Sequence, residues 1–242
     1  MGRLRVVLIG AAGQLGSDLA RTFDLDGELV ALKHQDLDLL DATRVGTLLA
    51  ELRPTHVVNT AAYNRVDQAE ADRDAAFALN ARAVGDLAAV CQRLGATLVH
   101  FSTDYVFDGR SETVVEESTP NPINVYGRSK LAGERNVLGE APDALVVRTC
   151  ANFGWNRLRG KENNVTWILN ALRTRKTVPL FTDQRVSPSY VPHVARLAFD
   201  LLEKEESGVY HAATKGCLTR YEIGEAVCDT FGLPTSLLKA ST

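Results

Sequence analysis

The chain has 242 residues, of which 45% are hydrophobic and 24% are charged, so it is long enough for one large α/β domain or for one domain with a smaller lobe. A formal net charge of −3 argues against nucleic acid or an anionic membrane surface as the main partner, and no apolar run is long enough to cross a membrane. The four cysteines have neither paired spacing nor nearby histidines, so we predict free thiols, no metal site and a cytoplasmic location.

Short runs of β-branched and apolar residues alternate with helical segments through the first two thirds of the chain. This alternation is typical of βαβ units and predicts an α/β fold with a parallel sheet. The clearest helices are expected at residues 44–52 and 74–94. Strands are expected at residues 4–9, 28–33, 56–59, 97–102 and 145–148.

A polar residue, Asn80, lies within the apolar stripe of the second of these helices. Phe77, Val84, Leu87 and Cys91 recur on the same face at helical spacing, which predicts a buried face. Asn80 is then either a hydrogen-bonded amide of the core or part of a functional site, and the stripe by itself favours the core amide.

The alternation weakens after Arg148, and we place a transition between two domains near residue 150. Residues 151–242 are expected to form mainly a smaller C-terminal lobe, interleaved with late elements of the first domain. No pattern after Phe231 predicts a further packed element. The elements expected in this part are a loop at 155–164, helices at 165–175, 193–204 and 220–231, and strands at 178–182 and 209–211.

A glycine motif, Gly10-x-x-Gly13-x-x-Gly16, follows the first expected strand directly. Such glycines permit a tight turn, close approach of the backbone to a pyrophosphate and close packing of the next helix, whose N-terminus then faces the phosphates. The alternative is a structural turn without a ligand, but the position in the first βα turn favours a dinucleotide site. We therefore predict a Rossmann-type, doubly wound NAD(P)-binding domain in residues 1–150.

Lys33, at the end of the second strand, favours NADPH over NADH, although a lysine there is also compatible with simple solvation.

Tyr126 and Lys130 are four residues apart in the segment Tyr126-Gly127-Arg128-Ser129-Lys130. On a helix this spacing stacks both side chains on one face, so we expect the ammonium near the phenol, where it would favour the ionised form. A phenol in that setting exchanges protons near neutral pH. The pair also occurs by chance on solvated helix faces, and it gains weight only beside the glycine motif.

These motifs together resemble the extended short-chain dehydrogenase/reductases, and within that group the dTDP-4-dehydrorhamnose reductase family. The most specific segment is Ser102-Thr103-Asp104-Tyr105-Val106-Phe107-Asp108-Gly109. The resemblance continues through the segments at 59–63, 66–70, 126–134, 148–149 and 183–188, and so covers nearly the whole chain.

The resemblance implies reduction of the C4 ketone of a dTDP-linked 4-keto-6-deoxyhexose by NADPH or NADH, as in dTDP-L-rhamnose biosynthesis. It implies a catalytic triad of Thr103, Tyr126 and Lys130, with Tyr126 as the proton donor. Lys130 would stabilise the tyrosinate and bond the nicotinamide ribose. The cofactor-binding residues that it implies are Gly10, Gly13, Gln14, Leu15, Gly16, Lys33, Asp38, Leu39, Ala61, Ala62, Tyr63, Asn80, Ser102, Tyr126 and Lys130.

Substrate contacts are implied for Asp104, Val106, Ala151 and Asn164. From the residues alone, Asp104 is equally well interpreted as a turn carboxylate at a strand end. The loop and helix after residue 150 also hold basic residues, each of which would meet the substrate diphosphate or remain solvated: Arg157, Arg159, Lys161, Arg173, Arg175 and Lys176.

Departures from the family pattern keep other functions open. Ala151 stands where the family has a tryptophan against the sugar, and Trp155 lies four positions further on. A reductase of a different 4-keto nucleotide sugar is therefore one alternative, and a non-catalytic, nucleotide-binding subunit of the methionine adenosyltransferase beta type is another.

Some family members form dimers around magnesium, but Tyr190 to His193 offer no carboxylate, so we expect no metal and at most a homodimer. Relatives usually extend some tens of residues beyond Phe231, so a further alternative is an incomplete C-terminus, with cofactor binding kept and sugar binding weakened.

Overall fold

The computed structural model describes residues 4–155 and 162–242. Its centre is a six-stranded sheet in the order β10-β5-β4-β3-β1-β2, in which every neighbouring pair is parallel. The order reverses between β1 and β3, so the carboxyl ends of these two strands form the crevice at which open α/β sheets bind ligands. The strands are β1 (Leu4–Ile9), β2 (Gly27–Leu32), β3 (His56–Asn59), β4 (Thr97–Thr103), β5 (Leu145–Thr149) and β10 (Gly208–Ala212).

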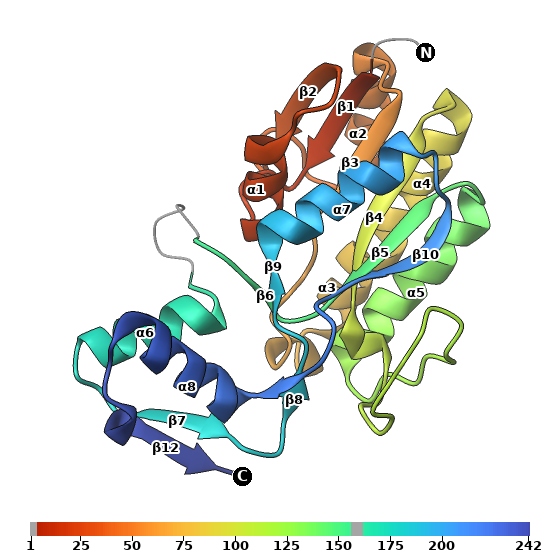
Figure 1. Cartoon of the computed structure of the whole chain (residues 1–242). Helices are drawn as coiled ribbons and strands as arrows, with labels where there is room; N and C mark the ends of the chain where they lie inside the picture. The colour runs from red at the N-terminus through yellow and green to blue at the C-terminus, as the bar shows by residue number, and fades with distance from the viewer. Residues whose placement is uncertain (1–3, 156–161) are drawn as a thin grey trace.

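Helices cover both faces of this sheet (Figure 1). Val6 and Leu8 of β1 pack on one face, against α1 and α7, whereas Val7 and Ile9 pack on the other, against α2, α4 and α5. This alternation follows from the two-residue period of a strand, and it confirms the doubly wound α/β fold. The helices are α1 (Gln14–Thr22), α2 (Ala42–Leu52), α4 (Ala83–Leu94), α5 (Val125–Glu140) and α7 (Val191–Glu203).

The helix expected at 74–94 is not continuous. The structure divides it into α3 (Arg73–Phe77), a π-helical turn (Ala78–Arg82) and α4. Asn80 lies in the π-helical turn and is 1% exposed, and its amide bonds a segment outside the helix. Apolar residues recur at helical spacing on both sides of the π-helical turn, which explains why the sequence predicts one continuous helix.

The C-terminal part of the chain has a core of its own, separate from the sheet (Figure 1). It is built from α6 (Asn164–Arg173), β7 (Val178–Phe181), α8 (Arg220–Phe231) and β12 (Leu238–Ser241). β12 pairs in parallel with β7, and Leu238 is 5% exposed. The expectation of no packed element after Phe231 is therefore wrong. A strand of four residues with one buried apolar side chain is too short to give a periodic pattern.

Residues 191–212 leave this second core and return to the sheet as α7 and β10. Two short strand pairs lie along the connections: β6 (Asn152–Phe153) with β9 (Ser189–Tyr190), and β8 (Arg185–Val186) with β11 (Leu218–Thr219). In the described part of the chain, no helix is both long and apolar enough to cross a membrane.

Candidate active site

The turn between β1 and α1 is tightly packed because of its glycines. Gly10 has a φ of +86°, and a Cβ there would lie 2.7 Å from the Ala61 nitrogen, while a Cβ on Gly16 would overlap the Gly10 carbonyl oxygen. Gly13 is the N-cap of α1 and provides no side chain to cap it. The first backbone N–H groups of α1 are thus left for an anion, as a pyrophosphate site requires.

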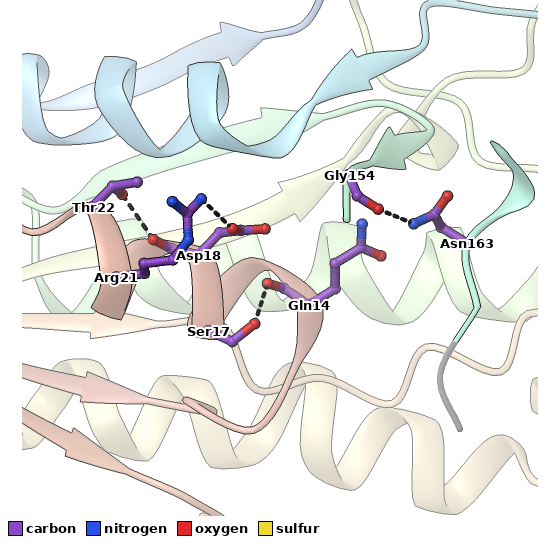
Figure 2. Close-up of polar contacts among 7 residues, drawn as sticks. All are labelled: Gln14, Ser17, Asp18, Arg21, Thr22, Gly154 and Asn163. Carbon is purple, nitrogen blue, oxygen red and sulfur yellow. Dashed lines mark hydrogen bonds and ion pairs between the residues drawn. The ribbon is translucent and has the colours of Figure 1, made fainter. Parts of the chain in front are cut away.

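Gln14 connects this turn to the second part of the molecule. Figure 2 shows its side chain extending from the start of α1 toward Gly154, whose carbonyl accepts a hydrogen bond of 2.7 Å from Asn163 Nδ2. Gln14 Nε2 is buried and has no hydrogen-bond partner among the described residues. A buried donor beside an uncapped helix N-terminus fits a polar ligand such as the cofactor diphosphate. Further along α1, Asp18 pairs with Arg21 at 2.7 Å (Figure 2).

The residues expected around the adenosine half of the cofactor follow β2. Lys33 is exposed at the strand end, and its backbone N–H donates to Asp36 Oδ2 at 2.8 Å, which closes a turn. Asp38 is exposed, but Leu39 is 3% exposed and belongs to the core beneath the sheet. Lys33 and Asp38 are therefore accessible to a ligand, whereas the Leu39 side chain supports the turn from below.

Asn80 holds the segment that follows β3. Its Oδ1 accepts from the Tyr63 backbone N–H at 2.8 Å, and its Nδ2 donates to the Tyr63 carbonyl at 3.0 Å and to Ser129 Oγ at 3.0 Å. Asn80 is thus a hydrogen-bonded core amide that also fixes residues 61–63 against α5. Ala61, Ala62 and Tyr63 are each half-buried on this edge.

Tyr126 lies in the first turn of α5, above the carboxyl end of β4. Asn124 caps the helix by accepting from the Gly127 N–H at 2.7 Å, and a Cβ on Gly127 would overlap the Tyr105 carbonyl, so α5 starts close against the turn at 104–106. Burial raises the pKa of Tyr126 to about 12, and a hydrogen bond with the Thr103 side chain opposes that shift. The phenol is therefore protonated and next to Thr103, as a proton donor must be.

Asp104 links Thr103 to a cysteine that the motif analysis did not assign to the site. Thr103 Oγ1 donates to Asp104 Oδ1 at 3.1 Å, and Cys150 Sγ donates to Asp104 Oδ2 at 2.9 Å. Burial raises the pKa of Asp104, while the bonds from Cys150 and Thr103 oppose the rise. Cys150 immediately precedes Ala151, so the departure of the sequence from the family pattern at Ala151 is the feature that could have indicated Cys150 as a site residue.

Lys130 is 2% exposed, and its Nζ does not bond where the four-residue spacing predicts. Nζ donates to the Phe101 carbonyl at 2.7 Å and lies 3.2 Å from His100 Nε2. Among the described residues it makes no hydrogen bond with Tyr126. The side chain extends inward onto β4, where a backbone carbonyl and a buried imidazole supply its partners, and burial lowers its pKa to about 8.

A buried ion pair fixes α5 to the sheet one turn beyond Lys130. Arg148 of β5 bonds Glu134 through both Nε (3.0 Å) and Nη2 (2.7 Å), and both residues are at least nine-tenths buried. A bidentate pair of this kind sets the rotation and height of the helix. The positions of Tyr126 and Lys130 above β4 depend on it.

The remaining substrate candidates differ in accessibility. Val106 has no exposed surface, which rules out direct contact of its side chain with substrate in this arrangement. Ala151 is half-buried with a φ of +40°, and Asn164 is exposed at the start of α6. Trp155 is 58% exposed and packs against Phe231, with ring centroids 6.0 Å apart, so it does not replace the missing tryptophan. Arg157, Arg159 and Lys161 lie outside the described residues, while Arg173, Arg175 and Lys176 are exposed.

Arg220 is a further candidate that sequence reasoning did not select. Its Nε donates to Gln184 Oε1 at 2.9 Å, and its Nη1 is buried without a partner among the described residues. Its charge lowers the pKa values of Asp104 and Cys150, although burial outweighs it in both cases. No local motif marks Arg220, because its position depends on the pairing of β8 with β11.

Comparisons with known proteins show the family of the chain. The model of the RmlD substrate binding domain family matches residues 4–242. This chain belongs to that family. The probable low-salt glycan biosynthesis reductase Agl14 of Haloferax volcanii is 38% identical, with coverage of 96% of this chain and 82% of that protein. The crystal structure of dTDP-4-dehydrorhamnose reductase from Bacillus anthracis in complex with NADP superposes with a TM-score of 0.94, at 30% identity, over 100% of this chain and 85% of that one.

Some relatives have names that do not describe a reductase. Methionine adenosyltransferase 2 subunit beta of Bos taurus is 33% identical, over 98% of this chain and 75% of that protein. Family membership is therefore compatible with more than one role, and the residues at the site have to distinguish them.

Proposed function

We propose that this chain is an NADPH-dependent reductase of the C4 ketone of a dTDP-linked 4-keto-6-deoxyhexose, as in the formation of dTDP-L-rhamnose. The observation that carries the proposal is the contact of the Tyr126 phenol with Thr103 at the carboxyl end of β4, in a chain that belongs to the RmlD family. A subunit without catalysis would not need a protonated phenol at this point of the sheet.

The cofactor site is supported by the residues of the first βα turn. Gly13 and the N-terminus of α1 would hold the pyrophosphate, Gln14 Nε2 would supply a further donor, and Ser102 Oγ is buried without a partner among the described residues at the end of β4. The nicotinamide, when bound, supplies the hydride to the ketone carbon. We prefer NADPH because Lys33 is exposed where a 2′-phosphate would lie.

The chain's own residues perform the proton transfer and orient the substrate. Thr103 Oγ1 donates to Asp104 in this structure, and it would turn that proton to the ketone oxygen to hold it. The Tyr126 hydroxyl would then give the same oxygen a proton as the alkoxide forms. The Lys130 ammonium would lower the pKa of Tyr126 and so make the release of its proton to the alkoxide easier. Asp104 accepts the Thr103 hydroxyl proton in the absence of substrate, and Arg220 brings a positive charge to the same end of the site.

The identity of the sugar depends on Ala151 and its neighbours. A tryptophan at that point would form an apolar wall, whereas Ala151 leaves room, and Cys150 and Asp104 add polar groups beside it. We propose that the pocket accepts the rhamnose precursor, with another 4-keto nucleotide sugar as the second candidate. A homodimer and a cytoplasmic location remain predictions, and sedimentation of the purified protein measures the first.

The test mixes purified protein with NADPH, dTDP-4-keto-6-deoxyglucose and its 3,5-epimerase, and follows nicotinamide absorbance. We expect oxidation that needs both sugar and epimerase, and a loss of turnover of at least roughly a hundredfold in Tyr126→Phe with little change in NADPH affinity. Tyr210→Phe is the matched control, because that hydroxyl bonds only Glu206 at the far edge of the sheet in the described structure. Saturable NADPH binding without any turnover would overturn the proposed substrate and leave two candidates, a reductase of another 4-keto nucleotide sugar and the regulatory subunit.

A further inference from the structure

A continuous set of buried hydrogen bonds runs from the end of β3 through β4 to α5. The Ala61 backbone N–H donates to Asn59 Oδ1 at 3.0 Å, and Asn59 Nδ2 lies 3.1 Å from His100 Nδ1. His100 Nε2 is 3.2 Å from Lys130 Nζ, which donates to the Phe101 carbonyl at 2.7 Å. Asn59 and His100 have no exposed surface, so each of these groups depends on the others for its hydrogen bonds.

The direction of each hydrogen bond in this set follows from the backbone N–H of Ala61 at one end of it. A backbone N–H only donates, so Asn59 must present Oδ1 to Ala61 and its Nδ2 to His100. An amide nitrogen also only donates, so His100 Nδ1 must carry a lone pair. Burial holds the pKa of His100 well below its ordinary value, so the ring is neutral and its single proton lies on Nε2. That proton points at Lys130 Nζ.

A nitrogen that accepts a hydrogen bond needs a lone pair, and an ammonium has none. If Lys130 were charged in this position, two donors would face each other across 3.2 Å at Nζ. If the ring proton were on Nδ1 instead, two donors would face each other between His100 and Asn59 Nδ2. If the Asn59 amide were also turned over, its Nδ2 would face the Ala61 N–H, which is again a donor. All the bonds are satisfied together when Nζ is an amine that accepts from His100 and donates to Phe101.

We propose that His100, fixed as its Nε2–H tautomer by Asn59, is a positioning residue that holds Lys130 as an uncharged amine in mildly alkaline solution. When NADPH binds, Lys130 takes up a proton from solvent, and the resulting ammonium turns away from His100 Nε2 to serve Tyr126. The second step rests on the proposed function, whereas the first does not involve the cofactor.

The charged groups around Lys130 are consistent with an amine at this position. Glu134, one turn along α5, is the nearby carboxylate that opposes loss of the proton, but both of its oxygens bond Arg148 of β5. β4 contributes the neutral ring of His100, and the preceding turn of α5 contributes Tyr126, whose phenol is protonated. Desolvation is therefore the dominant influence on Nζ, and it favours the uncharged form.

The first experiment reads the tautomer directly in the protein without cofactor. Two-bond correlations within ¹⁵N-labelled histidine rings identify which nitrogen of His100 bears the proton, and His100→Gln assigns the signal by removing it. We expect the proton on Nε2 at about pH 8.5 and above, where a Lys130 with a pKa of about 8 is mostly uncharged. A proton on Nδ1, or on both nitrogens, would overturn the proposal.

The second experiment measures proton uptake by calorimetry of NADPH binding at about pH 8.5, in two buffers that differ in ionisation enthalpy. The 2′-phosphate is fully ionised there, so it does not contribute, and we expect about one proton taken up per NADPH bound. Binding without uptake would contradict the coupling. An absence of binding would count against the proposed function and leave the tautomer result to decide the role of His100.

Asn59→Asp tests the source of the fixed tautomer. The carboxylate accepts both from Ala61 N–H and from a proton on His100 Nδ1, which frees Nε2 to accept from a Lys130 ammonium. We expect the tautomer to reverse and proton uptake to fall at least roughly threefold, since Lys130 is then already charged. Asn136→Asp is the control, because it adds the same charge to α5 but its amide bonds the Ala81 carbonyl. If Asn59→Asp keeps both the wild-type tautomer of His100 and the wild-type proton uptake, Asn59 does not fix the tautomer and the proposal is refuted. If this variant does not fold, the tautomer and the proton uptake of the wild-type protein decide.

Discussion

At the scale of single residues, the site depends on ionisable groups that are buried from water. Tyr126 is a protonated phenol, and Lys130 lies in an environment that disfavours its charge. Asp104 is buried with only neutral donors, Thr103 and Cys150, bonded to it. Side chains in such positions respond strongly to a nearby charge, because little water screens them.

The buried amine of Lys130 should make stability depend on pH in a specific direction. Its pKa in the folded protein is about 8, below the ordinary lysine value, so the unfolded chain binds the proton more tightly. The burial cost is present in full below about pH 8 and disappears as pH rises toward the unfolded value. We expect the unfolding free energy of wild type relative to Lys130→Met to rise by on the order of 3 kcal/mol between pH 7 and 10.

Urea unfolding at a series of pH values measures this difference. Lys204→Met serves as the control, because Lys204 is exposed at the end of α7 and its substitution should leave the pH dependence of wild type unchanged. A constant difference between wild type and Lys130→Met would show that Lys130 keeps an ordinary pKa in the folded state.

Lys33 governs cofactor preference if its ammonium meets a 2′-phosphate. It is exposed at the end of β2, and its backbone closes the turn with Asp36, so the side chain is free to move toward a ligand. Lys33→Ala should weaken NADPH binding roughly tenfold and leave NADH binding nearly unchanged, since one charge-assisted bond is lost. Fluorescence titration with both nucleotides gives the ratio, and an unchanged ratio removes Lys33 from the cofactor site.

At the scale of elements, α5 carries Tyr126 and Lys130 and contacts its neighbours closely at Gly127 and Gly133. A Cβ on Gly133 would overlap the Asn80 carbonyl of the π-helical turn, whereas Gly139, one and a half turns further, has nothing within 4 Å of such an atom. The close approach lets Asn80 reach Ser129 and Tyr63 at the same time.

Gly133 and Gly139 should therefore respond in opposite ways to the same substitution. Gly133→Ala should destabilise the protein by about 2 kcal/mol or more, because backbone must shift, and it should weaken NADPH binding by moving residues 61–63. Gly139→Ala should stabilise by up to about 1 kcal/mol through helix propensity. Thermal unfolding and NADPH titration of both variants check this, and equal effects at the two positions would be inconsistent with the close contact.

How far the sequence predicts each element depends on the length of its pattern. The five central strands and the doubly wound order follow from β-branched runs, and strand ends differ from the expectation by only one residue. The π-helical turn at Asn80, the position of Lys130 Nζ and the contacts of Cys150 and Arg220 were not predictable in this way. Each depends on atoms that the fold brings together from distant parts of the chain, such as Cys150 with Asp104 or Arg220 with Gln184.

At the scale of the whole molecule, the two cores are chemically independent. The core of the C-terminal part includes Ile168, Leu172, Ile223 and Leu238, and it shares none of these side chains with either face of the sheet. The sugar-binding candidates Asn164 and Arg220 are attached to this part, while the glycine turn belongs to the sheet.

Loosening β12 should consequently affect the substrate end more than the cofactor end. Leu238→Ala removes a side chain that is 5% exposed from the smaller core, and it should cost about 2–4 kcal/mol of stability there. NADPH affinity should change by less than about threefold, whereas KM for the nucleotide sugar should rise. Leu218→Ala, at a residue that is 37% exposed, is the control, and equal loss of NADPH binding in Leu238→Ala would contradict the independence of the cores.

The route of the chain between the two cores has a consequence for how such proteins diversify. The chain leaves the sheet after β5, returns as α7 and β10, and leaves again toward α8, so three connections join the parts. A substrate-recognising unit divided in this way cannot be exchanged between relatives as one contiguous segment. Recombination would have to transplant two stretches, roughly those before α7 and after β10, together. New sugar specificities in this architecture should therefore arise by point substitution in place, as at Ala151, and chimaeras built from a single crossover should fold poorly.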